Sequence, residues 1–294
     1  MRFVTETKHG GVGIWVAGAR PQTLTAAVVS VIVGTAAAGA PFRIDRAILA
    51  AVVALAVQIG ANYANDYSDG IRGTDAVRTG PARLVASGAA APAAVLRAAL
   101  IAFGIAAAAG IVLSLETNPW LIACGLAAIA AAWFYTGGPK PYGYYALGEV
   151  SVFVFFGLFG TLASAYVQHL TIGPIAVWAS IAVGSLTSAL LVANNLRDIP
   201  GDAAVGKRTL AVLMGDRATR ALYIGFLGVA GIALLAIVSV RPWAALAFIA
   251  ILVAIRPVRT VCAGATGRAL VPVLIDTGRL ELTFAVLFAI ALIV

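Results

Sequence analysis

Long runs of apolar residues, separated by short polar segments, follow one another along the whole chain. A helix needs about 20 apolar residues to cross the hydrocarbon core of a bilayer, and runs near that length recur. The runs are continuous rather than alternating, which argues against a membrane β-barrel. We therefore predict an all-α integral membrane protein that forms a single domain over residues 1–294. The nine predicted spans are Gln22–Ala40, Ala47–Asn65, Ala93–Leu115, Pro119–Tyr135, Tyr145–Val167, Ile175–Ala193, Ala218–Val240, Pro242–Ile255 and Leu280–Val294.

The composition agrees with this assignment. Of the 294 residues 62% are hydrophobic and 11% are charged, and the mean hydropathy is +0.99. A soluble domain has about 25% charged residues, so the surface of this protein is too poor in charge to face water. The two histidines, His9 and His169, are expected near opposite membrane faces, which leaves Ser–His or Cys–His catalysis without a base.

Basic residues fall mostly on one side of the predicted membrane. Of the 20 Lys and Arg residues, all except Arg43, Arg46 and Arg241 belong to the N-terminus or to loops on that side. By the positive-inside rule this side is cytoplasmic, so we predict a cytoplasmic N-terminus. The same rule accounts for the net charge of +8. We predict no nucleic-acid partner, because no basic face with interleaved aromatic residues lies outside the loops.

Two acidic clusters follow the second and sixth predicted spans. Because an even number of spans separates them, both clusters emerge on the same face of the membrane. The i, i+4 spacing within each cluster puts pairs of side chains on one side of a helical turn, unless Pro200 and Gly201 break the second helix and the pair straddles a bend. The first cluster is Asn65, Asp66, Asp69 and Asp75, and the second is Asn194, Asn195, Asp198 and Asp202.

Carboxylates gathered in this way favour a divalent cation. Crowded carboxylates disfavour one another's charge unless a cation intervenes, and Mg²⁺ commonly joins a few carboxylates to substrate phosphates. The alternative, that the aspartates only solubilise two loops, explains their matched positions less well. The predicted Mg²⁺ ligands are Asn65, Asp66, Asp69, Asp75, Asp198 and Asp202. Basic residues expected to bind the phosphates from the same loops are Arg72, Arg78, Arg83, Arg197, Lys207 and Arg208.

A third loop, Tyr135–Tyr145, connects the fourth and fifth predicted spans and contains Lys140 as its only cation. One interpretation is an aromatic belt at the membrane interface. The other is that Lys140 contacts a phosphate while tyrosines line the mouth of a hydrophobic cavity. The sequence leaves both open.

The acidic clusters resemble those of the UbiA superfamily of membrane prenyltransferases, which carry N-D-x-x-D-x-x-x-D and D-x-x-x-D motifs. Asn65, Asp66 and Asp69 match the first motif, but Gly73 stands at the last acidic position and Asp75 comes two residues late. The resemblance covers essentially the whole chain. Features similar to the branch that uses 1,4-dihydroxy-2-naphthoate are the late acid and the stretches Arg20–Leu24, Tyr135–Tyr142 and Asn194–Leu210.

The resemblance implies nine helices around a central cavity that faces the cytoplasm of a bacterial plasma membrane. It implies transfer of a polyprenyl group from polyprenyl diphosphate to 1,4-dihydroxy-2-naphthoate, with loss of diphosphate and CO₂, to give demethylmenaquinone in menaquinone (vitamin K2) biosynthesis. Mg²⁺ would make diphosphate a better leaving group, and aromatic faces would stabilise an allylic cation.

The resemblance also implies roles for individual residues. Small residues such as Ala64, Gly137 and Gly138 are expected to leave room for two fused rings. Expected catalytic residues are Asp66, Asp69, Lys140, Asp198 and Asp202. Expected ligand-binding residues are Arg20, Asn65, Arg72, Arg78, Tyr135, Asn195, Arg197 and Lys207. Expected aromatic walls are Tyr63, Tyr67, Tyr135 and Phe153.

Three alternatives stay open at this point. The first is a prenyltransferase of the same superfamily that uses a different acceptor, such as 4-hydroxybenzoate, homogentisate, a tetrapyrrole or phosphoribose diphosphate. A transporter with an acidic relay is a second alternative, although relays usually need charge within the bilayer and the acids here are expected near helix ends. A purely structural membrane protein is the third. The sequence does not give the oligomeric state or the prenyl chain length.

Overall fold

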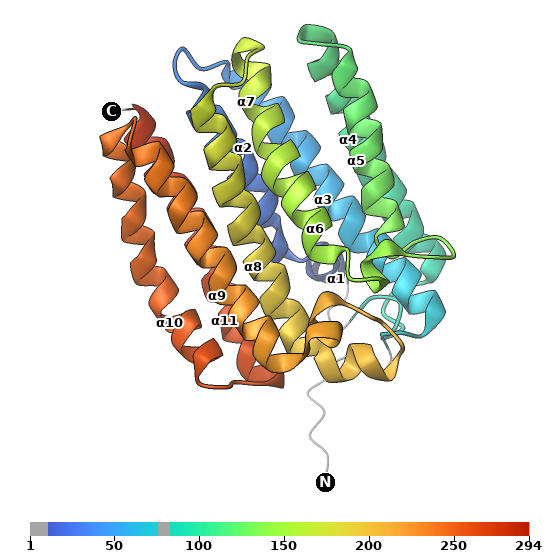
Figure 1. Cartoon of the computed structure of the whole chain (residues 1–294). Helices are drawn as coiled ribbons and strands as arrows, with labels where there is room; N and C mark the ends of the chain where they lie inside the picture. The colour runs from blue at the N-terminus through green and yellow to red at the C-terminus, as the bar shows by residue number, and fades with distance from the viewer. Residues whose placement is uncertain (1–10, 76–82, 294) are drawn as a thin grey trace.

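The computed structural model describes residues 11–75 and 83–293, and this part of the chain folds into helices without a β-strand. Most of the long helices run side by side in one bundle (Figure 1). The elements are α1 (Val12–Ala19), η1 (Pro21–Thr23), α2 (Leu24–Ala38), α3 (Ile44–Arg72), α4 (Pro92–Glu116), α5 (Trp120–Phe134), η2 (Tyr142–Tyr144), α6 (Gly148–Val152), η3 (Phe153–Gly160), α7 (Thr161–His169), α8 (Pro174–Ala204), α9 (Leu210–Val238), η4 (Pro242–Ala250), α10 (Ile251–Cys262), η5 (Gly267–Leu270) and α11 (Val271–Ile293).

The all-α fold confirms the prediction from the apolar runs. Among the described residues, seven helical segments are long and apolar enough to cross a membrane. Two more predicted spans correspond to α5, which has 15 residues, and to α11, whose first half carries Asp276, Arg279 and Glu281. The count of nine spans and the cytoplasmic N-terminus stay predictions.

The helices that carry the acidic clusters are longer than the predicted spans. Helix α3 continues seven residues beyond the predicted end at Asn65 and stops at Gly73, whose left-handed φ of 74° suits a glycine C-cap. Helix α8 passes through Pro200 and Gly201 to Ala204, so Asp198 and Asp202 keep helical i, i+4 spacing. Pro200 therefore does not interrupt the helix between the two aspartates.

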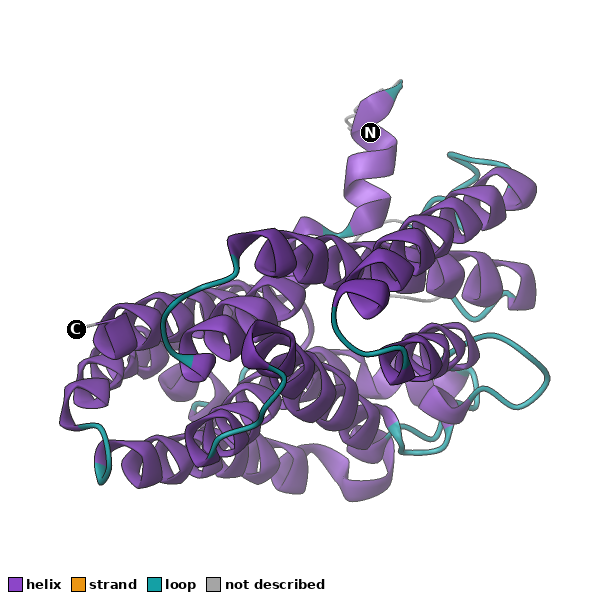
Figure 2. Cartoon of the chain, turned by 90° about the horizontal axis from the view of Figure 1, so that it is seen from above, coloured by secondary structure: helices purple, strands orange, loops and turns teal. Residues whose placement is uncertain are grey.

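Helix α8 is the central element of the bundle. It packs against α2, α9, α11 and the segment from α6 through α7. Within its apolar stretch of 18 residues, 72% is buried. The largest apolar core joins α2, α8, α9, η4 and α11 through residues such as Val33, Val183, Ile237 and Phe288. In the view from above (Figure 2), the helices form a ring-like arrangement rather than two flat layers.

Helix α3 has a different partner. It packs mainly on α4, and α5 rests on α3 and α4 without any fully buried residue. Several polar contacts tie this part of the bundle to the chain around α6 and α7, among them the following two. The Asn118 amide donates to Tyr166 Oη at 2.9 Å, and Tyr142 Oη donates to the carbonyl of Ala131 at 2.7 Å. The cavity described next lies between these parts.

The segment η3 is a π-helix of eight residues within an otherwise α-helical path. Its close approach to α8 depends on two glycines, because a Cβ on Gly157 would lie 2.2 Å from the Cα of Gly184. Side chains of η3 on the other side of this contact are thereby held against the cavity.

Candidate functional site

A cavity of about 640 Å³ extends from the C-terminal ends of α3 and α8 into the apolar interior. Its mouth is polar and is formed by both acidic clusters. Its body is lined by small or aromatic residues of α2, α3, α5, η3 and α7, including Ala26, Val57, Ala128, Phe155, Phe159 and Val167. Predicted site residues that line it are Arg20, Asn65, Asp66, Asp69, Tyr135, Asn195, Arg197, Asp198, Asp202 and Lys207.

Asp69 joins three separate parts of the chain at the mouth. One carboxylate oxygen accepts from Tyr144 Oη at 2.6 Å, and the other accepts from Lys207 Nζ at 3.1 Å. Lys207 reaches this position because Gly206 turns the chain with φ of 75° after α8, and its Nζ lies 4.7 Å from the centroid of the Tyr144 ring. The two acidic loops therefore meet, as their matched positions in the sequence predicted.

Tyr144 remains a hydrogen-bond donor at neutral pH. Burial, followed by the adjacent Asp69 carboxylate, raises the pKa of the Tyr144 hydroxyl well above its ordinary value. The backbone also fixes this loop, because the N–H of Arg208 donates to the carbonyl of Tyr144 at 3.0 Å. The loop between α5 and α6 thus belongs to the mouth of the cavity, as one interpretation of its tyrosines required.

The second cluster is organised by Arg197. Its Nε donates to Asp198 Oδ1 at 2.7 Å, and its Nη2 contacts Asp198 Oδ2 at 2.5 Å and Asn194 Oδ1 at 2.8 Å. On the neighbouring turn, the Asn195 amide donates to the buried Glu149 carboxylate of α6 at 2.8 Å. A bidentate guanidinium–carboxylate pair of this kind fixes both side chains.

Asp66 has different partners from Asp69. Its two carboxylate oxygens accept hydrogen bonds from the backbone N–H groups of Leu84 at 2.9 Å and Val85 at 3.0 Å, and the residue is 1% exposed. The tie holds the turn after residue 82 against α3 and brings Arg83 to the cavity wall. Arg83 Nε in turn lies 3.5 Å from a carboxylate oxygen of Asp75.

Several predicted residues are not brought to the cavity. Arg72 donates to the carbonyls of Thr136 and Gly138 instead. Asp75 pairs with Arg83 and does not itself line the cavity. Lys140 is exposed and does not line the cavity, whereas Lys207 does. Arg78 lies outside the described residues.

The aromatic wall differs from the expectation. Tyr135 lines the cavity, but Tyr63, Tyr67 and Phe153 do not. Tyr63 donates to the carbonyl of Trp15 at 2.7 Å, and Phe153 packs against Gly184. The aromatic rings that replace them come from the π-helical segment: Phe155, Phe156 and Phe159.

The small residues that widen the cavity also differ. Ala64, Gly137 and Gly138 are not part of the lining, and Gly137 packs on Trp133. Room in the cavity comes from Ala26, Ala27, Ala61, Gly125 and Ala128.

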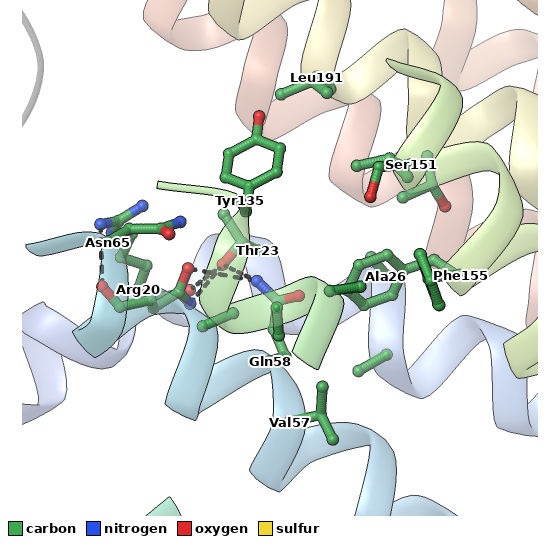
Figure 3. Close-up of a pocket in the computed structure, with 18 of the residues that line it drawn as sticks. Arg20, Thr23, Ala26, Val57, Gln58, Asn65, Tyr135, Ser151, Phe155 and Leu191 are labelled. Atoms are coloured by element: carbon green, nitrogen blue, oxygen red, sulfur yellow. Dashed lines mark hydrogen bonds between the residues drawn. The ribbon is translucent and has the colours of Figure 1, made fainter. Parts of the chain in front are cut away.

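A network of polar side chains lies below the mouth, and sequence reasoning missed most of it. Arg20 Nη2 donates to the carbonyl of Asn62 at 3.2 Å. Thr23, Gln58 and Asn62 are hydrogen-bonded to one another beside it (Figure 3). The signal was present, because Gln58 interrupts an apolar run that extends from Ala47 to Ala61.

The oxygen donors at the mouth suit a hard divalent cation in their chemistry. Asn65, Asp69, Asp198 and Asp202 face one cavity, although Asn65 Oδ1 also accepts from Thr136 Oγ1 at 2.7 Å. Within residues 11–75 and 83–293, no three acidic, histidine or cysteine side chains form a ready metal-binding group. Lys207 and Arg197 balance the charge of Asp69 and Asp198 there.

Comparison with known proteins places the chain among prenyltransferases. Residues 27–264 match the model of the UbiA prenyltransferase family. The chain is 49% identical over 280 residues to the 1,4-dihydroxy-2-naphthoate octaprenyltransferase of Mycobacterium tuberculosis, covering 95% of this chain and 96% of that protein. It is 38% identical to the Escherichia coli protein of the same description, over 72% of each chain.

Solved structures show the same fold. A UbiA homologue from Aeropyrum pernix K1 matches with a TM-score of 0.71 and 17% identity, over 92% of this chain and 96% of that chain. A UbiA homologue from Archaeoglobus fulgidus bound to GPP and Mg²⁺ matches with a TM-score of 0.71 and 13% identity, over 95% of this chain and 99% of that chain. The motifs, the fold and the family match agree, and this chain belongs to the UbiA prenyltransferase family.

Proposed function

We propose that this protein transfers a polyprenyl group from polyprenyl diphosphate to 1,4-dihydroxy-2-naphthoate, with release of diphosphate and CO₂, to give demethylmenaquinone. The observation that carries the proposal is one cavity with a mouth of carboxylates and cations above a long apolar body. Such a cavity suits a ligand with an anionic head and an isoprenoid tail. The choice of acceptor is supported by the relatives from M. tuberculosis and E. coli.

The charges at the mouth bind and orient the diphosphate. Mg²⁺ held by Asp69, Asp198 and Asp202 would supply positive charge that stabilises diphosphate as a leaving group. Arg83, Arg197 and Lys207 contribute further positive charge at the cavity wall, and guanidinium groups suit phosphate oxygens geometrically.

The apolar body protects the reacting carbon. Phe155, Phe159 and Tyr135 present aromatic rings below the mouth, and aromatic faces stabilise cationic carbon by cation–π attraction. The same apolar walls exclude water, which would otherwise capture an allylic cation. The acceptor approaches from the side of Arg20, whose guanidinium is suited to its carboxylate.

We place the site at the cytoplasmic face of a bacterial plasma membrane, on the strength of the basic residues in its loops. The lipid bilayer would deliver the prenyl substrate, since its tail is apolar.

The test is a reaction with purified protein, Mg²⁺, polyprenyl diphosphate and a panel of aromatic acids, with products identified by mass. We expect dihydroxynaphthoate to be used at least about tenfold better than 4-hydroxybenzoate, because burying a second ring adds apolar contact area. Equal use of both acids would overturn the choice of acceptor. Full activity in excess chelator would overturn the role of Mg²⁺.

A further inference from the structure

One polar side chain stands in the apolar body of the cavity without a role in the reaction described above. Gln58 lies on α3, seven residues before Asn65, on the side of the helix that lines the cavity. Its side chain is nine-tenths buried, with 9% of the residue exposed. A buried amide needs partners for both of its ends.

The network fixes which end of the Gln58 amide faces which way. The Thr23 hydroxyl donates to the carbonyl of Arg20 at 3.0 Å, so its oxygen can only accept further bonds. The Asn62 amide nitrogen donates to the carbonyl of Ala19 at 2.8 Å and to Thr23 Oγ1 at 3.0 Å, which leaves Asn62 Oδ1 as an acceptor. Gln58 Nε2 donates to both remaining acceptors, Thr23 Oγ1 at 3.3 Å and Asn62 Oδ1 at 3.2 Å.

Reversing the amide would set the Gln58 oxygen against two acceptors. The oxygen therefore points the other way, toward Ala26 and Phe155, as Figure 3 shows. No N–H or O–H group of the described residues donates to it. Gln58 lines the cavity, so a ligand bound there can reach this acceptor. The position fits a ligand group that donates a hydrogen bond.

Among the substrates of the proposed function, only the aromatic acceptor carries such a group in the apolar body. The prenyl chain has no donor, and diphosphate is an acceptor that binds at the mouth. In 1,4-dihydroxy-2-naphthoate the hydroxyl next to the carboxylate can bond internally to it. The hydroxyl on the far side of the ring is free to donate.

We propose that Gln58 Oε1 accepts a hydrogen bond from the ring hydroxyl remote from the acceptor's carboxylate, and so selects acceptors that carry this second hydroxyl. The assignment rests on the proposed function. Its geometry is consistent with the position of Arg20, whose guanidinium bonds the carbonyl of Asn62. Asn62 and Gln58 are four residues apart on α3, about 6 Å along the helix axis, which one substituted aromatic ring can span.

The experiment compares binding of three acceptors under anaerobic conditions, with Mg²⁺ and an unreactive polyprenyl thiodiphosphate. The ligands are 1,4-dihydroxy-2-naphthoate, 1-hydroxy-2-naphthoate and 1-hydroxy-4-methoxy-2-naphthoate. The last ligand keeps the remote oxygen but lacks its hydrogen. Dissociation constants are measured for the wild type, for Gln58→Met, and for the neighbouring cavity variant Val57→Ala as control. Binding is used as the readout because the second hydroxyl also changes the reactivity of the ring.

We expect the wild type to bind the dihydroxy acid about tenfold more tightly than either analogue. Gln58→Met should reduce that ratio to about one to two, while Val57→Ala should keep it near the wild-type value. Equal binding of the three ligands by the wild type would overturn the inference even if the variant fails to fold. An unchanged ratio in Gln58→Met would do the same.

Failure of the proposed function gives a different result. In that case the wild type forms no prenylated naphthoquinol from the dihydroxy acid and polyprenyl diphosphate. If product forms but the binding ratio does not depend on residue 58, the function stands and only the role of Gln58 is wrong.

Discussion

Replacing Asp66 by asparagine should release the turn that follows residue 82 from helix α3. The Asp66 carboxylate accepts one backbone N–H at each oxygen, from Leu84 and Val85. Asparagine keeps one acceptor but turns an NH₂ group toward the second N–H, so one bond is lost and the other loses its charge.

The magnitude follows from the hydrogen bonds involved. A hydrogen bond to a charged group contributes about 1.5–3 kcal/mol, and one between neutral groups about 0.5–1.5 kcal/mol. Exchanging two of the first kind for one of the second removes about 2.5–4.5 kcal/mol of local stability. If exchange of these amides follows local opening, it should become roughly 60- to 1,600-fold faster.

Hydrogen exchange followed by mass spectrometry, on protein in nanodiscs, measures this directly for a peptide that covers residues 83–90. The matched control is Asp69→Asn on the same helix, because Asp69 accepts from the side chains of Tyr144 and Lys207 and not from this turn. Unchanged exchange at Leu84 and Val85 in Asp66→Asn, or an equal loss of protection in the control, would refute the reasoning.

Three further predictions follow from the structure. Gly157→Ala should lower the thermal unfolding midpoint, since its Cβ would lie 2.2 Å from Gly184 Cα and overpacking costs about 1–3 kcal/mol. The control Gly225→Ala, with nothing within 4 Å of its Cβ, should leave the midpoint unchanged, and equal midpoints for the two variants would contradict the contact. Lys207→Met should weaken binding of polyprenyl diphosphate at least about tenfold, while Lys140→Met, at an exposed residue, should bind it nearly as the wild type does. The reverse order of affinities would show that Lys140, and not Lys207, contacts the diphosphate. With Cys124 and Cys262 replaced by serine, single cysteines introduced at Ile71 and Ala204 should react with an impermeant thiol reagent from the cytoplasmic side, and one introduced at Asp45 should react from the other side. Reaction of the first two from opposite sides would exclude a shared mouth.

The apolar runs predicted the helical fold because a bilayer leaves few other ways to satisfy the backbone. They failed where a helix faces a polar cavity. Asp66 and Asp69 end the apolar run, yet α3 continues to Arg72 because its other faces still pack. The same reason extends α8 past Asp198. Hydropathy alone does not distinguish a loop in water from a helix that lines a hydrated mouth.

The candidate site was predictable as far as spacing determines it. The pairs Asn65–Asp69 and Asp198–Asp202 have i, i+4 spacing near the C-terminal ends of α3 and α8. The segments after these helices were expected on one face, and Asp69 and Lys207 do lie together. The choice between lysines was not predictable, because it depends on how two loops turn: Gly206 directs Lys207 inward, whereas Lys140 remains in solvent. The aromatic wall was missed for a related reason, since the π-helical segment changes which phenylalanines face the cavity.

That π-helical segment has a consequence for how the pocket can be altered. A turn closed by i→i+5 bonds holds about one residue more than an α-helical turn. Deleting one residue between Phe153 and Gly160 would therefore let the segment relax to an α-helix. Because the wide turns already accommodate the extra residue, the helices on either side would keep nearly the same facing, and the phenylalanines of η3 itself would change the direction in which they point. In the lineage of such a protein, a single deleted codon at η3 would re-aim the aromatic wall of the pocket while α6 and α7 stay in place, a change that no single substitution can make.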